Sequence, residues 1–217
     1  MIHSQSLYQR GGKRLFDLAL TVLLLTVWLI FVAVIALIVR LRLGRPVLFK
    51  QERLGLGGQS FFIRKFRTMT NAGDVHGNLL PDAERLTDLG SFLRATSLDE
   101  LPELINVLTG EMSLVGPRPL YAHYRGRYTR EQFRRHEAVP GITGWAQING
   151  RNAVGWVEKF ELDVWYVDHL SFWLDLKILS ITLWKAFKRE DINQPGQATV
   201  EEFMGTPGKQ PRHIAGP

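Results

Sequence analysis

The stretch from Leu18 to Val39 constrains the fold most, because it contains no charged residue and only two threonines as polar residues. As an α-helix it would be about 33 Å long, enough to cross the ~30 Å hydrocarbon core of a bilayer. A secretory signal normally has a shorter apolar region and a small-residue cleavage site, whereas here Arg40 and Arg42 follow at once. The sequence therefore predicts a membrane anchor helix in residues 1–45.

Basic residues flank both ends of this apolar segment: Arg10, Lys13 and Arg14 before it, and Arg40, Arg42, Arg45 and Lys50 after it. The positive-inside rule therefore gives no orientation. A helix that enters and leaves by one face would place both ends on the same side, but the Pro or Gly that usually breaks such a helix is absent. Re-entrant and spanning geometries both stay open.

The composition narrows the class of partner. The chain of 217 residues has a net charge of +6 and a sequence pI near 9.8, which favours anionic partners such as lipid headgroups, nucleotides or phosphates. It contains no cysteine, which excludes disulfides and thiolate metal sites. Its scattered histidines form no zinc-binding pattern.

Residues 46–200 are expected to form one domain, followed by a polar tail at 201–217. Two β-rich runs within 46–69, separated by the glycines around Gly57, predict a β-hairpin whose second strand places Ile63, Lys65 and Arg67 on one face. Helical spacing predicts helices at about 81–95, from Ser97–Asp99 to Gly110, and at about 155–168 and 172–189. The expected fold class is α+β and mainly helical, with aromatic amphipathic helices suited to a membrane interface.

The adjacent carboxylates Asp99 and Glu100 have two interpretations. Ser97 and Glu100 have the spacing of a capping box, and Asp99 would be an ordinary acid in a first helical turn. Alternatively, a helix N-terminus would keep Asp99 ionised, so that it could attack phosphorus as a nucleophile.

Phosphate chemistry also needs cations near the acid pair. Arg94, Arg118 and Arg151 lie in stiff or loop contexts, and arginine grips phosphate oxygens bidentately. Lys65 is a weaker candidate for the same task, with a solvated basic face as the alternative. No GxxxxGK[ST] sequence is present, so a P-loop enzyme is excluded.

Six motifs follow one another in a recognisable order: Lys13-Arg14-x-x-Asp17, Lys65-Phe66-Arg67-Thr68-Met69, Ser97-Leu98-Asp99-Glu100-Leu101-Pro102, Gly116-Pro117-Arg118-Pro119, Pro140-Gly141-Ile142-Thr143-Gly144 and Asn149-Gly150-Arg151-Asn152. With them the chain resembles the small monotopic phosphoglycosyl transferases, a bacterial sugar-transferase family, from about Lys13 to about Phe203. The resemblance implies transfer of a sugar 1-phosphate from a UDP-sugar to undecaprenyl phosphate, with release of UMP.

The resemblance also implies roles for individual residues. Asp99 would form a covalent phosphosugar intermediate and bind Mg²⁺, and Glu100 would be its acid/base or positioning partner. Arg94, Arg118 and Arg151 match the family's phosphate-handling arginines, with Lys65 as a further candidate. The catalytic domain is expected on the cytoplasmic face of the bacterial inner membrane.

One feature departs from the family pattern, and another bears on the identity of the sugar. The family usually breaks a re-entrant helix at a Ser-Pro pair, which the equivalent stretch 26–31 lacks. The run from Gly196 to Thr199 resembles members that use diacetylated bacillosamine.

Two functions from other classes compete. One is a non-catalytic membrane adaptor that binds anionic lipid through its basic surface. The other is nucleic-acid binding through the Tyr- and Arg-rich stretch 121–135, although no nucleic-acid-binding motif is present. Neither needs a fixed acid pair beside stiff arginines, so UDP-sugar, undecaprenyl phosphate and membrane lipid are the expected partners, and nucleic acid is not.

Overall fold

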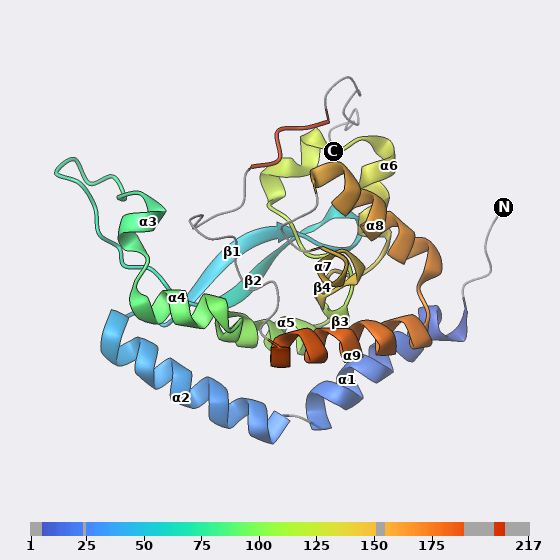
Figure 1. Ribbon diagram of the computed structural model, residues 1–217, viewed down its shortest axis with the longest axis horizontal. Coiled ribbons are helices and arrows are strands. Elements are labelled where there is room, and N and C mark those ends of the chain that lie inside the picture. The colour runs from blue at the N-terminus through green and yellow to red at the C-terminus, as the bar shows by residue number, and fades with distance from the viewer. Residues whose placement is uncertain (1–5, 24, 151–154, 189–201, 207–217) are drawn as a thin grey trace.

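The computed structural model describes residues 6–23, 25–150, 155–188 and 202–206. It confirms the mainly helical α+β class: a β-hairpin lies at the centre, with helices around it and α1, α2 and α9 along one side (Figure 1). The elements are α1 (Lys13–Leu23), α2 (Leu25–Leu43), β1 (Leu48–Leu54), β2 (Ser60–Phe66), α3 (Asp82–Arg85), α4 (Asp88–Ala95), α5 (Leu104–Thr109), β3 (Ser113–Val115), α6 (Arg130–Phe133), β4 (Gly141–Thr143), α7 (Trp145–Ile148), α8 (Trp156–His169) and α9 (Phe172–Lys188).

The predicted apolar helix is divided between two elements, α1 and α2. Within the described residues, α2 alone has the length and apolar composition to cross a membrane. In Figure 1 the two helices diverge from a common region, and the outer end of each lies near the rest of the protein.

One face of α2 packs against the domain along most of its length. Ile35 and Val39 are buried in a cluster with Phe66 of β2 and Leu93 of α4. Near the other end of α2, the Trp28 side chain is buried and its Nε1 donates to the Leu101 carbonyl at 2.9 Å. The helix therefore lies along the domain surface from residue 28 onward.

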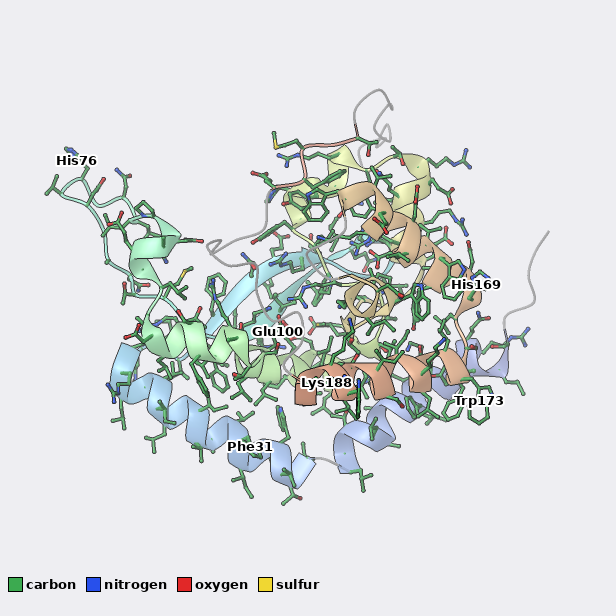
Figure 2. All side chains as sticks on the ribbon, in the orientation of Figure 1. Phe31, His76, Glu100, His169, Trp173 and Lys188 are labelled. Carbon is green, nitrogen blue, oxygen red and sulfur yellow. The ribbon has the colours of Figure 1, made fainter. Side chains whose placement is uncertain are left out.

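The remaining surface of α2 is apolar and exposed, at Val27, Leu29, Ile30, Phe31, Val34, Leu37 and Leu41. In α9, for which the sequence predicts a position at a membrane interface, Trp173 and Trp184 are 74% and 61% exposed. Figure 2 shows Phe31 and Trp173 at the outer edge formed by these helices, with Glu100 in the interior of the molecule. Together α1, α2 and α9 expose one apolar side, which we call the apolar platform.

The predicted hairpin is confirmed. β1 and β2 pair antiparallel, and the connection contains Gly57 and Gly58 with positive φ, a conformation that glycine adopts readily. In the register, Lys65 lies opposite Phe49 and Ile63 opposite Gln51, so Ile63 and Lys65 share a face as predicted.

The predicted helix 81–95 is wrong as one element, because it is interrupted between α3 and α4. Leu86 forms an antiparallel bridge with Met69, at the other end of the loop that joins β2 to α3. Thr87 then caps α4, with its hydroxyl accepting from the Gly90 amide at 3.0 Å. A tertiary backbone contact of this kind leaves no mark on helical periodicity.

The helices predicted at 155–168 and 172–189 correspond to α8 and α9. α8 contributes Phe160 to an aromatic core with Tyr124 and Tyr128. Phe203 is buried in the same core, although it comes from the segment predicted as a tail.

A buried polar cluster joins α1 to α9. The Asp175 side chain is fully buried and accepts from Lys13 Nζ at 2.6 Å, from the Tyr8 hydroxyl at 2.7 Å and from the Tyr166 hydroxyl at 2.7 Å. Arg14, which follows Lys13 in α1, donates to the Val107 and Leu108 carbonyls. The start of the apolar segment is thus fixed to the domain by charge.

We expect Asp175→Asn to lower the free energy of unfolding by about 3–5 kcal/mol, because Lys13 would stay buried without a counter-charge. Asp82→Asn is the matched control: Asp82 is 45% exposed in its side chain and pairs with Arg85 at 3.5 Å. Such surface pairs contribute about 0–1 kcal/mol. Denaturant titration in detergent measures both variants, and equal losses would contradict the inferred role of the cluster.

Candidate active site

Asp99 and Glu100 lie in a short 3-10 helix, Leu98–Glu103, which we call the acid turn. It packs against β2 and α4 and leads directly into α5, which ends at Gly110 as predicted. Ser97, the residue before it, has a left-handed backbone with φ of 55°, which is uncommon for a residue other than glycine.

The predicted capping box is wrong. Ser97 makes no side-chain cap to the acid turn, and the Glu100 carboxylate bonds to Lys65 and Arg118 instead. Lys65 Nζ lies 2.6 Å from Glu100 Oε1, and Arg118 reaches both carboxylate oxygens, one of them at 3.5 Å. Glu100 thus ties β2 to the segment containing Arg118.

These ion pairs set the charge state of Glu100. Burial alone would raise the pKa of Glu100, but Arg118 and Lys65 outweigh burial and hold the pKa well below its ordinary value. Glu100 is therefore a carboxylate throughout the physiological pH range.

Asp99 is in a different environment although it is the next residue. Its side chain is buried, with the residue 8% exposed, and within the described part of the chain its carboxylate has no hydrogen bond or ion pair. Burial, followed by the charge of Glu100, raises the pKa of Asp99 to about 6. The expectation that a helix N-terminus keeps this pKa low is thus wrong.

The structure brings most of the predicted cations to the acid turn. Lys65 and Arg118 contact Glu100, and they and Arg94 act electrostatically on Asp99. Arg94, at the end of α4, donates from Nε to the Thr68 hydroxyl at 3.1 Å. Arg151 lies outside the described residues.

Arg118 is positioned by its backbone. Gly116 pairs with the neighbouring strand, its amide donating to the Thr143 carbonyl at 2.8 Å, and the Pro117 carbonyl accepts from Gly141. A Cβ at Gly116 would lie 2.2 Å from the Val139 carbonyl oxygen, so this close approach requires glycine. The Pro140–Gly144 motif therefore supports the Gly116–Pro119 motif.

A buried ion pair that the sequence did not reveal completes this support. Arg135, 2% exposed, donates to Asp163 Oδ2 from Nε at 2.9 Å and from Nη2 at 2.7 Å. The same Nη2 donates to the Arg118 carbonyl at 2.7 Å. Arg135 occurs in the stretch that suggested nucleic-acid binding, but its side chain is turned inward.

Glu103 is a third carboxylate that sequence reasoning missed. It is 3% exposed and lies 3.2 Å from Lys65 Nζ. Burial and the charge of Glu100 raise the pKa of Glu103. Its position one helical turn after Glu100 was the available signal.

The comparisons with known proteins identify the family of the chain. The sequence profile of the family described as bacterial sugar transferase matches residues 8–189. The "Uncharacterized sugar transferase EpsL" of Bacillus subtilis (strain 168) is 56% identical over 194 residues, covering 89% of this chain and 96% of that protein.

Two longer relatives carry named activities. The "UDP-glucose:undecaprenyl-phosphate glucose-1-phosphate transferase" of Escherichia coli (strain K12) is 42% identical over 185 residues, covering 81% of this chain and 40% of the relative. The "Galactosyl transferase CpsE" of Streptococcus agalactiae serotype III is 42% identical over 154 residues, covering 64% of this chain and 34% of the relative. The chain thus spans less than half the length of these two relatives. Because the family profile matches most of its residues, the chain belongs to the bacterial sugar transferase family.

Proposed function

We propose that the protein transfers a sugar 1-phosphate from a UDP-sugar to undecaprenyl phosphate and releases UMP, through a covalent intermediate on Asp99. One observation carries the proposal: Asp99 is a buried carboxylate without a described partner, beside a cluster in which Glu100 is bonded to Lys65 and Arg118. The family supplies the reaction class, and relatives are named for undecaprenyl phosphate and UDP-sugars.

The reaction exchanges one phosphorus–oxygen bond in each of two steps. An Asp99 oxygen attacks the phosphorus that carries the sugar, and the bond to the bridging oxygen breaks, so that UMP leaves with that oxygen. An oxygen of undecaprenyl phosphate then attacks the same phosphorus, and the bond to Asp99 breaks. The second step restores the carboxylate and forms the lipid diphosphate sugar.

Within this scheme we assign Glu100 a positioning role. A carboxylate whose pKa is held low by two cations is a poor proton donor or acceptor near neutral pH. Its ion pairs instead fix Lys65 and Arg118 beside Asp99. These cations, with Arg94 and Arg151, would stabilise negative charge on the transferring and leaving phosphates.

The residues present also fit Mg²⁺. Mg²⁺ is usually held by one or two carboxylates together with substrate phosphates and water. Asp99 offers a carboxylate without a described partner, whereas no group of three or more His, Asp or Glu residues gathers in the described part of the chain. Asp99 and the phosphate oxygens of the nucleotide would hold the ion, which when bound neutralises charge on the diphosphate.

We further propose that α1 and α2 enter the bilayer and return on the cytoplasmic face of the bacterial inner membrane. Contacts from Trp28 to Val39 fix α2 along the domain, and Asp175 fixes the start of α1. A helix held in this way does not carry its far end to the opposite side. The apolar platform then faces lipid, and the exposed Arg10 before the segment and Arg40 and Arg42 at its end would face the headgroups.

The identity of the sugar is the most specific part of the proposal. The resemblance of the run from Gly196 to Thr199, which lies outside the described residues, favours UDP-N,N'-diacetylbacillosamine or another N-acetylated amino sugar. Relatives are named instead for glucose and for galactosyl transfer. A substrate panel must therefore contain both classes.

The first experiment incubates the protein with Mg²⁺ and a panel of UDP-sugars and measures the intact protein mass together with UMP release. We expect one sugar class to add the mass of its sugar phosphate. Asp99→Asn should abolish both signals, because an amide is a poor nucleophile. Asp88→Asn, at an exposed position in α4, is the control that should keep both.

An Asp99→Asn variant that still forms the adduct would remove Asp99 as the nucleophile. A wild-type protein that binds anionic vesicles but yields neither adduct nor UMP with any sugar would favour the adaptor.

The pH dependence of adduct formation tests the environment of Asp99. Only the carboxylate attacks, so the rate should fall as pH drops through about 6, the raised pKa of Asp99. Glu100→Gln should slow the step by about 10²-fold through misplaced cations. It should also move the midpoint to lower pH, because the charge of Glu100 raises the pKa of Asp99.

Glu84→Gln, on the exposed surface of α3, should change neither the rate nor the midpoint. A midpoint that stays fixed or rises in Glu100→Gln would argue against the coupling of the two carboxylates.

The topology can be tested with single cysteines, since the native chain has none. In membrane vesicles of known orientation, an impermeant maleimide should label Ser6→Cys and His76→Cys from the same, cytoplasmic side. Both positions are exposed. Labelling of the two cysteines from opposite sides would show that the apolar segment spans the membrane.

A further inference from the structure

Arg53 is a basic residue near the acid turn that neither the motifs nor the proposed roles include. It lies near the end of β1, and in the hairpin register it is opposite Phe61. Because the face alternates along a strand, Arg53 lies on the same face as Lys65, which is opposite Phe49 at the other end of the hairpin. The two cations therefore project from the same side of the sheet.

The Arg53 side chain is held in place by neutral groups. Its guanidinium lies over the Tyr121 ring, 3.7 Å from the centroid, and donates to the Gln51 side-chain oxygen. The backbones of Arg53 and Tyr121 also form an antiparallel bridge. Since Tyr121 comes three residues after Arg118, one short segment positions both arginines.

The three basic residues near the acid turn differ in whether a carboxylate pairs with them. Glu100 pairs with Lys65 and Arg118, and Glu103 pairs with Lys65. Arg53 has no carboxylate partner in the described part of the chain, and its Nε is buried without a hydrogen-bond partner there. The Arg53 side chain is partly buried, and no carboxylate among the described residues pairs with its charge, so the site favours an anion from outside.

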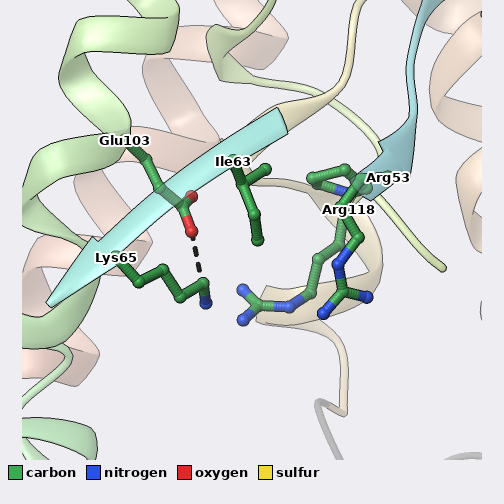
Figure 3. Close-up of a pocket in the computed structure, with 6 residues that line it drawn as sticks. Arg53, Ile63, Lys65, Glu103 and Arg118 are labelled. Carbon is green, nitrogen blue, oxygen red and sulfur yellow. Dashed lines mark ion pairs between the residues drawn. The ribbon is translucent and has the colours of Figure 1, made fainter. Parts of the chain in front are cut away.

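A pocket lies in front of these cations. Arg53, Lys65, Glu103 and Arg118 line it, and Figure 3 shows the cationic ends of the three basic residues directed toward a common space. The pocket is small and opens to solvent, so it suits one part of a substrate, such as a phosphate group, rather than a whole small molecule.

The position of Arg53 in the hairpin distinguishes between the two phosphates of the reaction. Leu48, at the other end of β1, packs in the cluster that contains Ile35 and Val39 of α2. Arg53 is five residues further, which is about 17 Å along a strand. It therefore lies toward the end of the hairpin away from α2, which is the side from which a water-soluble nucleotide, rather than a lipid phosphate, would approach.

We infer that Arg53, stacked on Tyr121, is a phosphate-binding residue for the nucleotide and contacts the phosphate that leaves with UMP. The inference rests on the proposed function, because it places a phosphate of the UDP-sugar in this pocket. The planar guanidinium of Arg53 would grip phosphate oxygens while Lys65 and Arg118 remain bonded to Glu100.

The test measures UMP affinity by calorimetry in the full-length protein with Mg²⁺ present. Arg53→Gln should weaken UMP binding by at least tenfold, and Arg53→Lys should have an intermediate effect, since it keeps the charge without the fork. Arg125→Gln is the matched control, because Arg125 is exposed in the turn that follows Tyr121. It should bind UMP as the wild type does.

Two kinetic arms distinguish the sources of phosphate. In the first, Arg53→Gln should raise the KM for the UDP-sugar in adduct formation by tenfold or more. In the second, adduct isolated from the same variant should pass its phosphosugar to undecaprenyl phosphate at the wild-type rate. Slower discharge with unchanged loading would overturn the inference in favour of the lipid phosphate.

Tyr121→Leu provides an independent variant that retains Arg53, should Arg53→Gln fail to fold. We expect weaker UMP binding from the unsupported guanidinium, and unchanged affinity in Tyr121→Phe, which keeps the ring. Unchanged UMP affinity in folded Arg53→Gln, or in Tyr121→Leu, would overturn the inference alone. Absence of any adduct in the wild type would instead count against the proposed function.

Discussion

The arrangement of the site depends on the ion pairs of Glu100. This one carboxylate bonds to Lys65 from the hairpin and to Arg118 from the Gly116–Pro119 motif, so three segments far apart in sequence meet at it. Because Glu100 holds these two cations, Asp99 stays buried beside positive charge without being paired by it. Adjacent residues thereby acquire opposite properties: one carboxylate organises the site and the other remains available for chemistry.

Elements with strong local signals could be predicted from the sequence. The hairpin follows from two β-rich runs around glycines, and α8 and α9 follow from aromatic helical spacing. The single helix predicted for 81–95 was wrong because the bridge between Leu86 and Met69 is a tertiary contact. Likewise, Ser97 and Glu100 have the spacing of a capping box, but Ser97 has a left-handed backbone and its side chain makes no cap.

The structure brings together the two acids and several of the cations that the sequence proposes for a site. The sequence favours the arginines over Lys65, because a strand lysine is usually solvated, yet Lys65 bonds to Glu100 and Glu103. Arg53 was missed because its role depends on hairpin register and on Tyr121, which is distant in sequence. Motifs identify residues that act together, but only the fold shows which neighbours complete the charge balance.

The hydrogen bond from Trp28 to the Leu101 carbonyl has a consequence for biogenesis. Leu101 lies two residues after Asp99, so a residue of the apolar segment helps to build the turn that carries the proposed nucleophile. A newly made chain lacks this support until α2 has packed onto the domain. The acid turn and the apolar segment would therefore reach their final arrangement together, so that activity would appear only once the segment is in place.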